Sequence, residues 1–261
     1  FPRRAAPGRR AARSRAIAAA LLIGLVLAGC GRKADKTRSA GPNLVLLTVD
    51  TLRADRLGCY GNSRDTSPVI DRLAKEGALF EEAYAQRGST WPSLASIMTS
   101  QHPVTHGVRE NGMQLSNAPD ALAEVLTARG YHCGAVVANS AQQNWEGFDS
   151  VQDVQAVPQD RHVADAAARW LQTNSERPFF LWVHYVAPHD PYEPPAEFDR
   201  FTEDGYTGRV DGGLVSTTQV ILDHVVPTKE ELAHLDALYD GEVAFSDAML
   251  EPVLDALEQG G

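Results

Sequence analysis

Two residues that could carry out ester transfer stand at the ends of predicted structural elements. Asp50 directly follows residues 43–49, a nearly unbroken apolar run typical of a strand buried on both faces. Thr90 stands at the cap of a predicted helix over residues 90–99, with Pro92 in its first turn. A carboxylate at the end of such a strand can bind a hard cation. A hydroxyl at a helix N-terminus lies beside free backbone N–H groups that stabilise a tetrahedral anion. Together they indicate ester transfer at phosphorus or sulfur.

Each residue alone also has a purely structural interpretation. Threonine is an ordinary helix cap, so Thr90 alone would not indicate chemistry. An aspartate at the end of a strand often forms a turn, which would account for Asp50. The sequence around both residues therefore has to decide between the two interpretations.

The first 42 residues predict export and anchoring rather than folded structure. Six arginines within residues 3–15 precede the uncharged stretch 16–29, which is too short to span a bilayer as a helix. The stretch ends in Leu27-Ala28-Gly29-Cys30, which resembles the lipobox of bacterial lipoproteins. The resemblance implies a signal peptide over residues 1–30, lipidation of Cys30 and a flexible tether over residues 31–42. A plain secretory signal with an incidental cysteine is the alternative. An exported lipoprotein would lie on the cell membrane or outer membrane, facing the periplasm or the exterior.

Charge divides sharply along the chain. Residues 1–40 contain ten Lys or Arg against one Asp, a net charge of +9, and the whole chain carries −10, so residues 41–261 carry −19. Such an acidic body argues against nucleic acid as a partner, which requires a basic face. Besides Cys30, only Cys59 and Cys133 are present. They fit two small packing residues, or a single pair in an exported protein.

Residues 43–261 alternate strand-like and helix-like segments, which predicts a mixed α/β domain. Strands are expected over 43–49, 131–138 and 179–186, and helices over 67–77, 119–129, 161–173 and 228–260, the last kinked at Pro252. Residues 187–226 show no period. The chain ends where the βαβ rhythm would call for a further strand, so a truncated domain is expected.

Seven sequence blocks in order resemble the sulfatases of the alkaline phosphatase-like superfamily. They cover residues 43–61, 66–74, 90–99, 102–108, 147–149, 178–192 and 239–247. Each block is weak alone, but the series in order is specific. The resemblance implies a mixed, mostly parallel sheet flanked by helices, and it makes residues 43–261 the N-terminal portion of a catalytic domain.

The resemblance also implies roles for single residues. Asp50 matches the family's metal ligand, Thr90 its nucleophile bound to the same metal, and His189 a residue that contacts substrate or donates a proton. Asn111 is the best match to an asparagine that touches a non-bridging oxygen, although a turn residue before Gly112 fits equally well. The implied cofactor is a divalent cation, calcium if the chain is sulfatase-like and zinc or manganese if it transfers phosphoryl groups.

Several positions depart from the family pattern. Sulfatases oxidise a Cys or Ser nucleophile to formylglycine, whereas oxidation of Thr90 would give a ketone. Leu94 stands in place of the motif arginine, and Thr51 replaces a second acid after Asp50. The family's Asp-His pair that completes the metal site is expected beyond residue 261, so the isolated fragment should be nearly inactive.

Three functions follow from these patterns. The first is a metal-dependent hydrolase of sulfate or phosphate esters, and the second a phosphotransferase or phosphodiesterase of the same superfamily. The third is a non-catalytic surface lipoprotein that binds a sulfated or phosphorylated glycan. Each of these functions requires an anionic ester as ligand, which could be a sulfated or phosphorylated glycan, lipid or small molecule.

Overall fold

A four-stranded parallel sheet forms the centre of the domain. The computed structural model describes residues 41–115, 120–138, 146–174, 178–213, 220, 222 and 226–260; the predicted signal peptide and Cys30 lie outside them. The sheet order is β1-β4-β2-β3, and all three neighbouring pairs are parallel. The strands are β1 (Leu44–Val49), β2 (His132–Ala138), β3 (Ser150–Val154) and β4 (Phe179–Tyr185). The predicted α/β fold with a mostly parallel sheet is thus confirmed.

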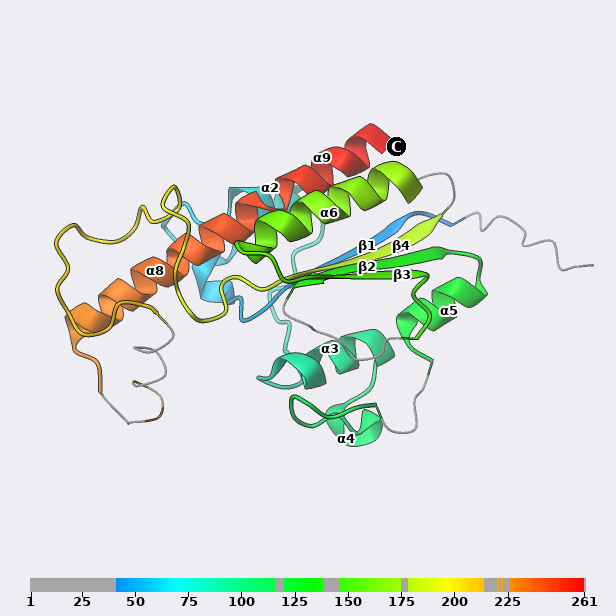
Figure 1. Ribbon diagram of the computed structural model, residues 1–261, viewed down its shortest axis with the longest axis horizontal. Helices are drawn as coiled ribbons and strands as arrows, with labels where there is room; N and C mark the ends of the chain where they lie inside the picture. Colours follow the sequence, from blue (N-terminus) through cyan, green and yellow to red (C-terminus); the bar gives the residue numbers. More distant parts are fainter. Residues whose placement is uncertain are drawn as a thin grey trace, which may run out of the picture. The chain divides into compact units, whose positions relative to one another are not determined.

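Helices cover both faces of the sheet (Figure 1). One face carries α6 (Gln159–Asn174), α8 (Lys229–Ala248) and α9 (Glu251–Gly260), and α2 (Pro68–Glu76) contacts α8. The other face carries α3 (Thr90–Thr99) and α5 (Leu122–Ala128), and α4 (Pro103–His106) packs against α3. Two short 3-10 turns follow β1, η1 (Ala54–Arg56) and η2 (Gly58–Tyr60). Within the described residues, no helix is long and apolar enough to cross a bilayer.

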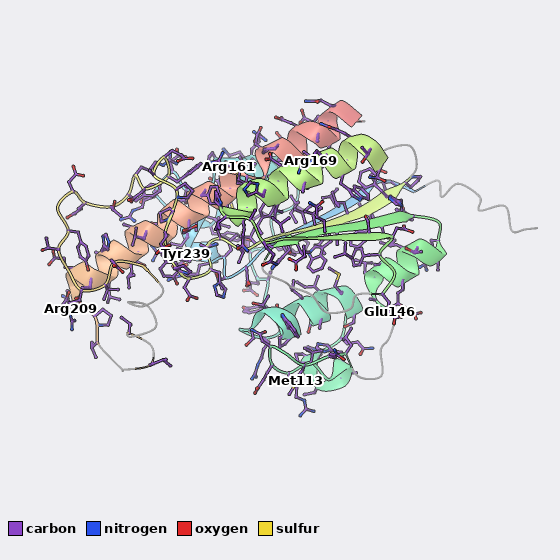
Figure 2. All side chains as sticks on the ribbon, in the orientation of Figure 1. Met113, Glu146, Arg161, Arg169, Arg209 and Tyr239 are labelled. Atoms are coloured by element: carbon purple, nitrogen blue, oxygen red, sulfur yellow. The ribbon has the colours of Figure 1, made fainter. Side chains whose placement is uncertain are left out.

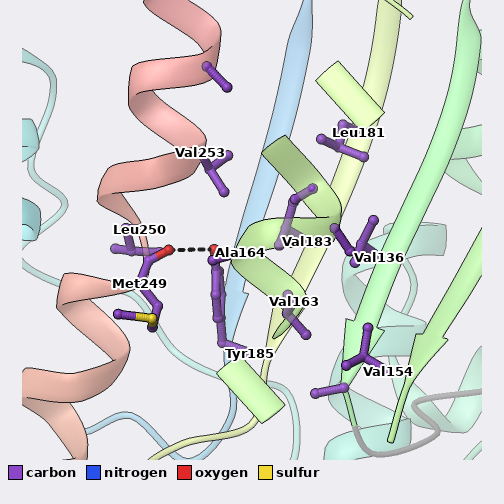
Figure 3. Close-up of a cluster of buried hydrophobic side chains, with 14 of the residues drawn as sticks. Val136, Val154, Val163, Ala164, Leu181, Val183, Tyr185, Met249, Leu250 and Val253 are labelled. Atoms are coloured by element: carbon purple, nitrogen blue, oxygen red, sulfur yellow. Dashed lines mark hydrogen bonds between the residues drawn. The ribbon is translucent and has the colours of Figure 1, made fainter. Parts of the chain in front are cut away.

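The central strand β4 is buried along its whole length because both of its faces are covered. Alternate side chains of a strand point to opposite faces. Leu181, Val183 and Tyr185 therefore pack against α6 and α9, where the Tyr185 hydroxyl donates to the Met249 carbonyl at 3.0 Å (Figure 3). Trp182 packs toward α3 and α5 on the opposite face. Such burial explains the continuous apolar run in the sequence.

The helix predicted over residues 228–260 begins as expected but is not continuous. Thr228 accepts a hydrogen bond from the Glu231 N–H at 3.2 Å, the first half of the predicted capping box. The helix then ends at Ala248, and α9 begins at Glu251. The prediction of one kinked helix was wrong, because the Pro252 ring displaces the carbonyl four residues earlier and supplies no N–H.

Two further boundaries differ from the sequence-based expectation. Strand β3 was not predicted, because Ser150–Val154 has only five residues and mixes polar with apolar side chains. Helix α5 begins at Leu122, since the preceding Ala121 is extended and its N–H donates to the Glu124 carboxylate at 2.7 Å. Of the segment 187–226, in which the sequence shows no period, residues 187–213 contain neither helix nor strand, whereas Val220 and Leu222 are helical. Cys133 and Cys59 lie in different hydrophobic clusters, as two small packing residues do.

Candidate active site

The structure brings Asp50 and Thr90 together, forty residues apart in sequence. Asp50 continues β1, and its N–H donates to the Tyr185 carbonyl at the end of β4 at 3.0 Å. The Thr90 hydroxyl donates to Asp50 Oδ2 at 2.9 Å. A carboxylate at the carboxyl edge of the sheet therefore orients a hydroxyl from the first turn of α3, as the two sequence patterns predicted.

The N-terminus of α3 differs from the predicted one in two ways. Ser89 is the cap, with extended backbone, and Thr90 is the first helical residue. Most N–H groups of the first turn are also occupied or missing. The Trp91 N–H donates to Asn111 Oδ1 at 3.0 Å and the Ser93 N–H to the Ser89 carbonyl at 3.2 Å. Pro92 has no N–H, so within the described residues only the Thr90 N–H keeps no partner. The expected row of free N–H groups was wrong.

A cleft of about 450 Å³ opens between these elements. Its charged, amide and imidazole side chains and its hydroxyl groups come from the ends of β1 and β4, from α3 and from the loops beside them: Thr48, Asp50, Thr51, Arg87, Ser89, Thr90, Ser93, Asn111, His184 and His189. All four residues predicted to act in catalysis, metal binding or substrate contact therefore line one cleft. Arg87 and His184 were not assigned to the site from the sequence.

Asn111 holds α3 in addition to lining the cleft. Its Oδ1 accepts the Trp91 N–H, which satisfies one of the unpaired donors at the start of the helix. The amide nitrogen of Asn111 has no partner in the described part of the chain. The structure thus gives Asn111 a capping role, and its contact with substrate stays a prediction.

His189 lies in the segment that follows β4. Its Nδ1 is 2.8 Å from the Asp190 carbonyl oxygen, which can only accept, so Nδ1 carries a proton. The Asp190 carboxylate lies 3.2 Å from the same nitrogen. This arrangement fixes the ring and leaves Nε2 as the nitrogen that can take up or give a proton toward the cleft.

His184 is the polar residue within the buried strand β4. Its Nδ1 lies 2.9 Å from the Thr48 hydroxyl, which also accepts the Trp182 indole N–H at 2.9 Å. Burial lowers the pKa of His184 to about 4, against the opposing charge of Asp50. The ring is therefore neutral. The prediction of a hydrogen-bonded core histidine is confirmed, and the structure adds that this ring also borders the cleft.

The turn after Asp50 is held by a residue from α8. Thr51 has φ 54°, a conformation uncommon for a residue with a branched side chain. The Tyr239 hydroxyl donates to the Thr51 carbonyl at 2.7 Å and accepts the Arg53 N–H at 3.0 Å. Figure 2 labels Tyr239 on α8. Burial raises the pKa of Tyr239 to about 12, so the hydroxyl stays protonated and can donate.

The cleft is lined by one carboxylate, that of Asp50, and one guanidinium, that of Arg87. Among its lining residues Asp50 is the only acid and Arg87 the only Lys or Arg. Arg87 is exposed and has no ion-pair partner within the described residues. Leu94 contributes an apolar wall to the cleft on the α3 side. An anionic ligand would therefore meet one guanidinium, and its apolar portion could lie against Leu94.

Asp50 and Thr90 supply two oxygen donors of the kind that hard divalent cations prefer. Across the residues that the structure describes, no three His, Cys, Asp or Glu side chains come together as a metal-binding group. These two donors fit part of a divalent-cation site, and Asp50 and Thr90 are the residues that would hold such an ion.

The parallel sheet with helices on both faces defines the class of an α/β protein. The structure is similar to the phosphonate monoester hydrolase of Agrobacterium radiobacter, with a TM-score of 0.67 and 20% sequence identity, covering 85% of this chain and 60% of that one. At this identity the likeness concerns the fold alone.

The sequence gives the family. Residues 42–261 match the sulfatase family, and the chain belongs to it. It is 26% identical over 160 residues to the ulvan-active sulfatase of Formosa agariphila, covering 59% of this chain and 32% of that protein. It is 25% identical over 196 residues to the N-acetylglucosamine-6-O-sulfatase of Bacteroides thetaiotaomicron, covering 66% and 35%. The chain therefore spans about a third of the length of these relatives.

Proposed function

We propose that this protein hydrolyses sulfate or phosphate esters with Thr90 as the nucleophile. The observation that carries the proposal is the 2.9 Å hydrogen bond from the Thr90 hydroxyl to Asp50 inside the cleft. A hydroxyl becomes nucleophilic when an adjacent acceptor orients it and takes its proton. The hydroxyl stands in the first turn of a helix, where the dipole favours the negative charge that builds during transfer.

Thr90 and His189 have different roles in the proposed reaction. Thr90 Oγ gives its proton to Asp50, attacks sulfur or phosphorus and forms a covalent ester, while the bond to the alcohol oxygen breaks. His189, protonated at Nε2, gives its proton to that leaving oxygen. Water then hydrolyses the Thr90 ester and releases inorganic sulfate or phosphate. Transfer to another alcohol instead of water would make the protein a phosphotransferase, the alternative within the same superfamily.

A divalent cation completes the proposal. Asp50 and Thr90 would hold it, and both offer oxygen, which favours calcium or manganese over metals that prefer nitrogen or sulfur. A bound cation would lower the pKa of the Thr90 hydroxyl and neutralise charge on the ester.

The substrate class follows from the cleft and from the relatives. The relatives are named for ulvan and for the 6-O-sulfate of N-acetylglucosamine, and the structural neighbour for phosphonate monoesters. We propose an anionic ester, foremost a sulfated or phosphorylated glycan, whose charged group approaches Arg87 and Thr90. An apolar or sugar portion would contact Leu94.

The test compares Asp50→Ala and Thr90→Ala in the full-length protein, with aryl sulfate, aryl phosphate and aryl phosphodiester as substrates. Each change should lower turnover by about 10³-fold or more, and the double variant should be scarcely worse, because the two residues act as one unit. Asp165→Ala on α6 and Thr105→Ala on α4, both exposed, are the controls. Undiminished turnover in Thr90→Ala would refute the mechanism. Saturable glycan binding without any turnover by the unchanged protein would favour the non-catalytic alternative.

Export and anchoring are a separate proposal, which rests on the sequence pattern of residues 3–30. We propose that Cys30 carries lipid and holds the protein at a membrane surface outside the cytoplasm. Metabolic labelling with a palmitate analogue should mark the unchanged protein and the Cys59→Ala control, and the mark should be lost in Cys30→Ala. Label that survives in Cys30→Ala would contradict the anchor.

A further inference from the structure

The cleft is lined by several groups that can donate a hydrogen bond to an anion, among them the Ser89 and Ser93 hydroxyls and the Asn111 amide. Of the backbone N–H groups of residues 90–93, only that of Thr90 has no partner within the described residues, because Asn111 and Ser89 accept two of the others and Pro92 has none. Arg87 contributes its guanidinium from the exposed rim. These donors all come from residues 87–111, and the strand β4 adds a buried one, His184.

His184 reaches the cleft from β4. It follows Trp182 on the face of β4 that packs toward α3, and its register partner on β1 is Thr48, two residues before Asp50. The residue is 2% exposed and borders the cleft. Its Nδ1 faces Thr48, whereas Nε2 has no hydrogen-bond partner within the described residues. The ring is thus buried except where it meets the cleft.

The contacts of Thr48 decide which ring nitrogen carries the proton. The Thr48 oxygen accepts the Trp182 indole N–H, so its single hydroxyl proton is left for one further bond. That proton can go to His184 Nδ1 at 2.9 Å or to the Val183 carbonyl at 3.3 Å. The longer distance is poor for an O–H donor, so the bond to Nδ1 is favoured.

We propose that His184 is a further substrate-contacting residue, which donates its Nε2–H to an oxygen of the sulfate or phosphate group. The inference rests on the proposed function, because it concerns the same cleft and the same anionic group. His184 acts as a neutral donor whose direction is fixed by the Thr48 hydroxyl and the Trp182 indole. It complements Arg87, which contributes charge at the rim.

The first test uses a pair of variants that differ in one donor. His184→Gln keeps an N–H near the position of Nε2, whereas His184→Leu removes it at similar volume. In the full-length protein, His184→Leu should lower kcat by about 10²-fold, as the loss of one donor to a developing anion does. His184→Gln should recover at least tenfold of that loss. Both variants lose the Thr48 contact, so equal activity of the two, with equal thermal stability, would overturn the proposal. His162→Leu on α6 is the control for a histidine away from the cleft.

The second test needs no turnover. Imidazole ¹H–¹⁵N spectra of the labelled chain should show His184 protonated at Nε2, and this signal should shift saturably as inorganic sulfate or phosphate is added. Thr48→Val removes the hydroxyl that fixes Nδ1 and should allow the other tautomer to appear. A proton on Nδ1 in the unchanged protein, or a His184 signal that responds to neither anion, would overturn the inference. Failure of the proposed function would be seen differently, as full turnover in Thr90→Ala.

Discussion

Thr90 differs from a serine nucleophile by one methyl group on Cβ, and that methyl group decides its chemistry. Oxidation of a primary alcohol or thiol at this carbon gives the aldehyde of formylglycine, whereas oxidation of threonine would give a ketone. Leu94, which lies 4% exposed in the core, also stands where the family's maturation motif has arginine. Intact-peptide mass spectrometry should therefore show residue 90 as unmodified threonine. A peptide lighter by two hydrogens, or one trapped by a carbonyl reagent, would contradict the mechanism proposed for Thr90.

Arg87 is the residue that should attract an anionic substrate to the cleft. As the only Lys or Arg that lines the cleft, it should attract an anionic ester before the reaction begins. Arg87→Gln should raise KM for an aryl sulfate or phosphate by about tenfold, with a smaller change in kcat and a weaker dependence of KM on salt. Arg87→Lys should recover part of the loss, because it keeps the charge but not the planar fork.

The control for Arg87 is Arg169→Gln on α6, which removes the same charge at an exposed position outside the cleft (Figure 2). Equal rises in KM for the two variants would show that net charge alone acts. Such a result would remove Arg87 from the binding site.

At the scale of elements, α8 controls the turn that follows β1. Tyr239→Phe removes the hydroxyl that joins the Thr51 carbonyl and the Arg53 N–H, and it leaves both groups without this partner. Loss of a part-buried bridge of this kind costs about 1–3 kcal/mol of unfolding free energy. Because the turn positions Asp50, turnover should fall by about tenfold as well.

Chemical denaturation and steady-state kinetics would measure the two effects of Tyr239→Phe. Tyr60→Phe is the matched control, since the Tyr60 hydroxyl donates to the Phe80 carbonyl at 2.7 Å on an exposed surface. Stability lost without loss of turnover would mean that Tyr239 supports the fold but does not position Asp50.

The hydrogen bond between Tyr239 and Arg53 is a contact that the sequence did not predict. Strands β2 and β4 were predicted because burial on both faces leaves a continuous apolar run. Strand β1 was also predicted correctly as a strand, but the expectation that it is buried on both faces was wrong, because β1 lies at the edge of the described sheet and its side chains are only partly buried. The meeting of Asp50 and Thr90 was inferred from a strand end and a helix start, which are both places where α/β proteins bind ligands, and from the resemblance to sulfatases. Tyr239 lies 186 residues from Arg53, and no local pattern of either segment marks their hydrogen bond.

A second limit on prediction from the sequence is that the hydrogen-bond partner of a backbone N–H can come from another segment of the chain. The free N–H groups expected at the start of α3 are partly taken by Asn111, which a reading of the helix alone does not reveal. The position of His184 at the cleft depends on its register with Thr48, which is fixed only by the pairing of β1 with β4. The short strand β3 lacks the apolar alternation that identified the other strands.

At the scale of the whole molecule, three buried carboxyl groups join segments distant in the sequence. Asp160 on α6 accepts the Val186 N–H at 2.8 Å, and Glu242 on α8 accepts the Glu193 N–H at 2.9 Å. Asp247 accepts two N–H groups at the start of α2, at 3.0 and 2.9 Å. Burial raises the pKa of Asp160 and of Asp247 to about 6 and that of Glu242 to about 7.

These raised pKa values predict an unusual dependence of stability on pH. Between about pH 4 and 7 the folded state binds more protons at these carboxyls than the unfolded state does, so the free energy of unfolding falls as pH rises through this window. Their contribution is complete below the ordinary carboxyl pKa and is lost above about pH 7. The midpoint of thermal unfolding should therefore be higher at pH 5 than at pH 8, with a difference on the order of a few kcal/mol in unfolding free energy.

Glu242→Gln tests the origin of this dependence. Glutamine keeps an oxygen to accept the Glu193 N–H but cannot ionise, so the variant should be more stable than the unchanged protein at pH 8 and similar to it at pH 5. Glu230→Gln, exposed in the first turn of α8, removes the same charge and serves as the control for general repulsion in an acidic chain. Thermal unfolding of the three proteins across pH 5 to 8 measures the effect. If Glu230→Gln flattens the profile as much as Glu242→Gln does, net charge rather than the buried carboxyl governs the pH dependence.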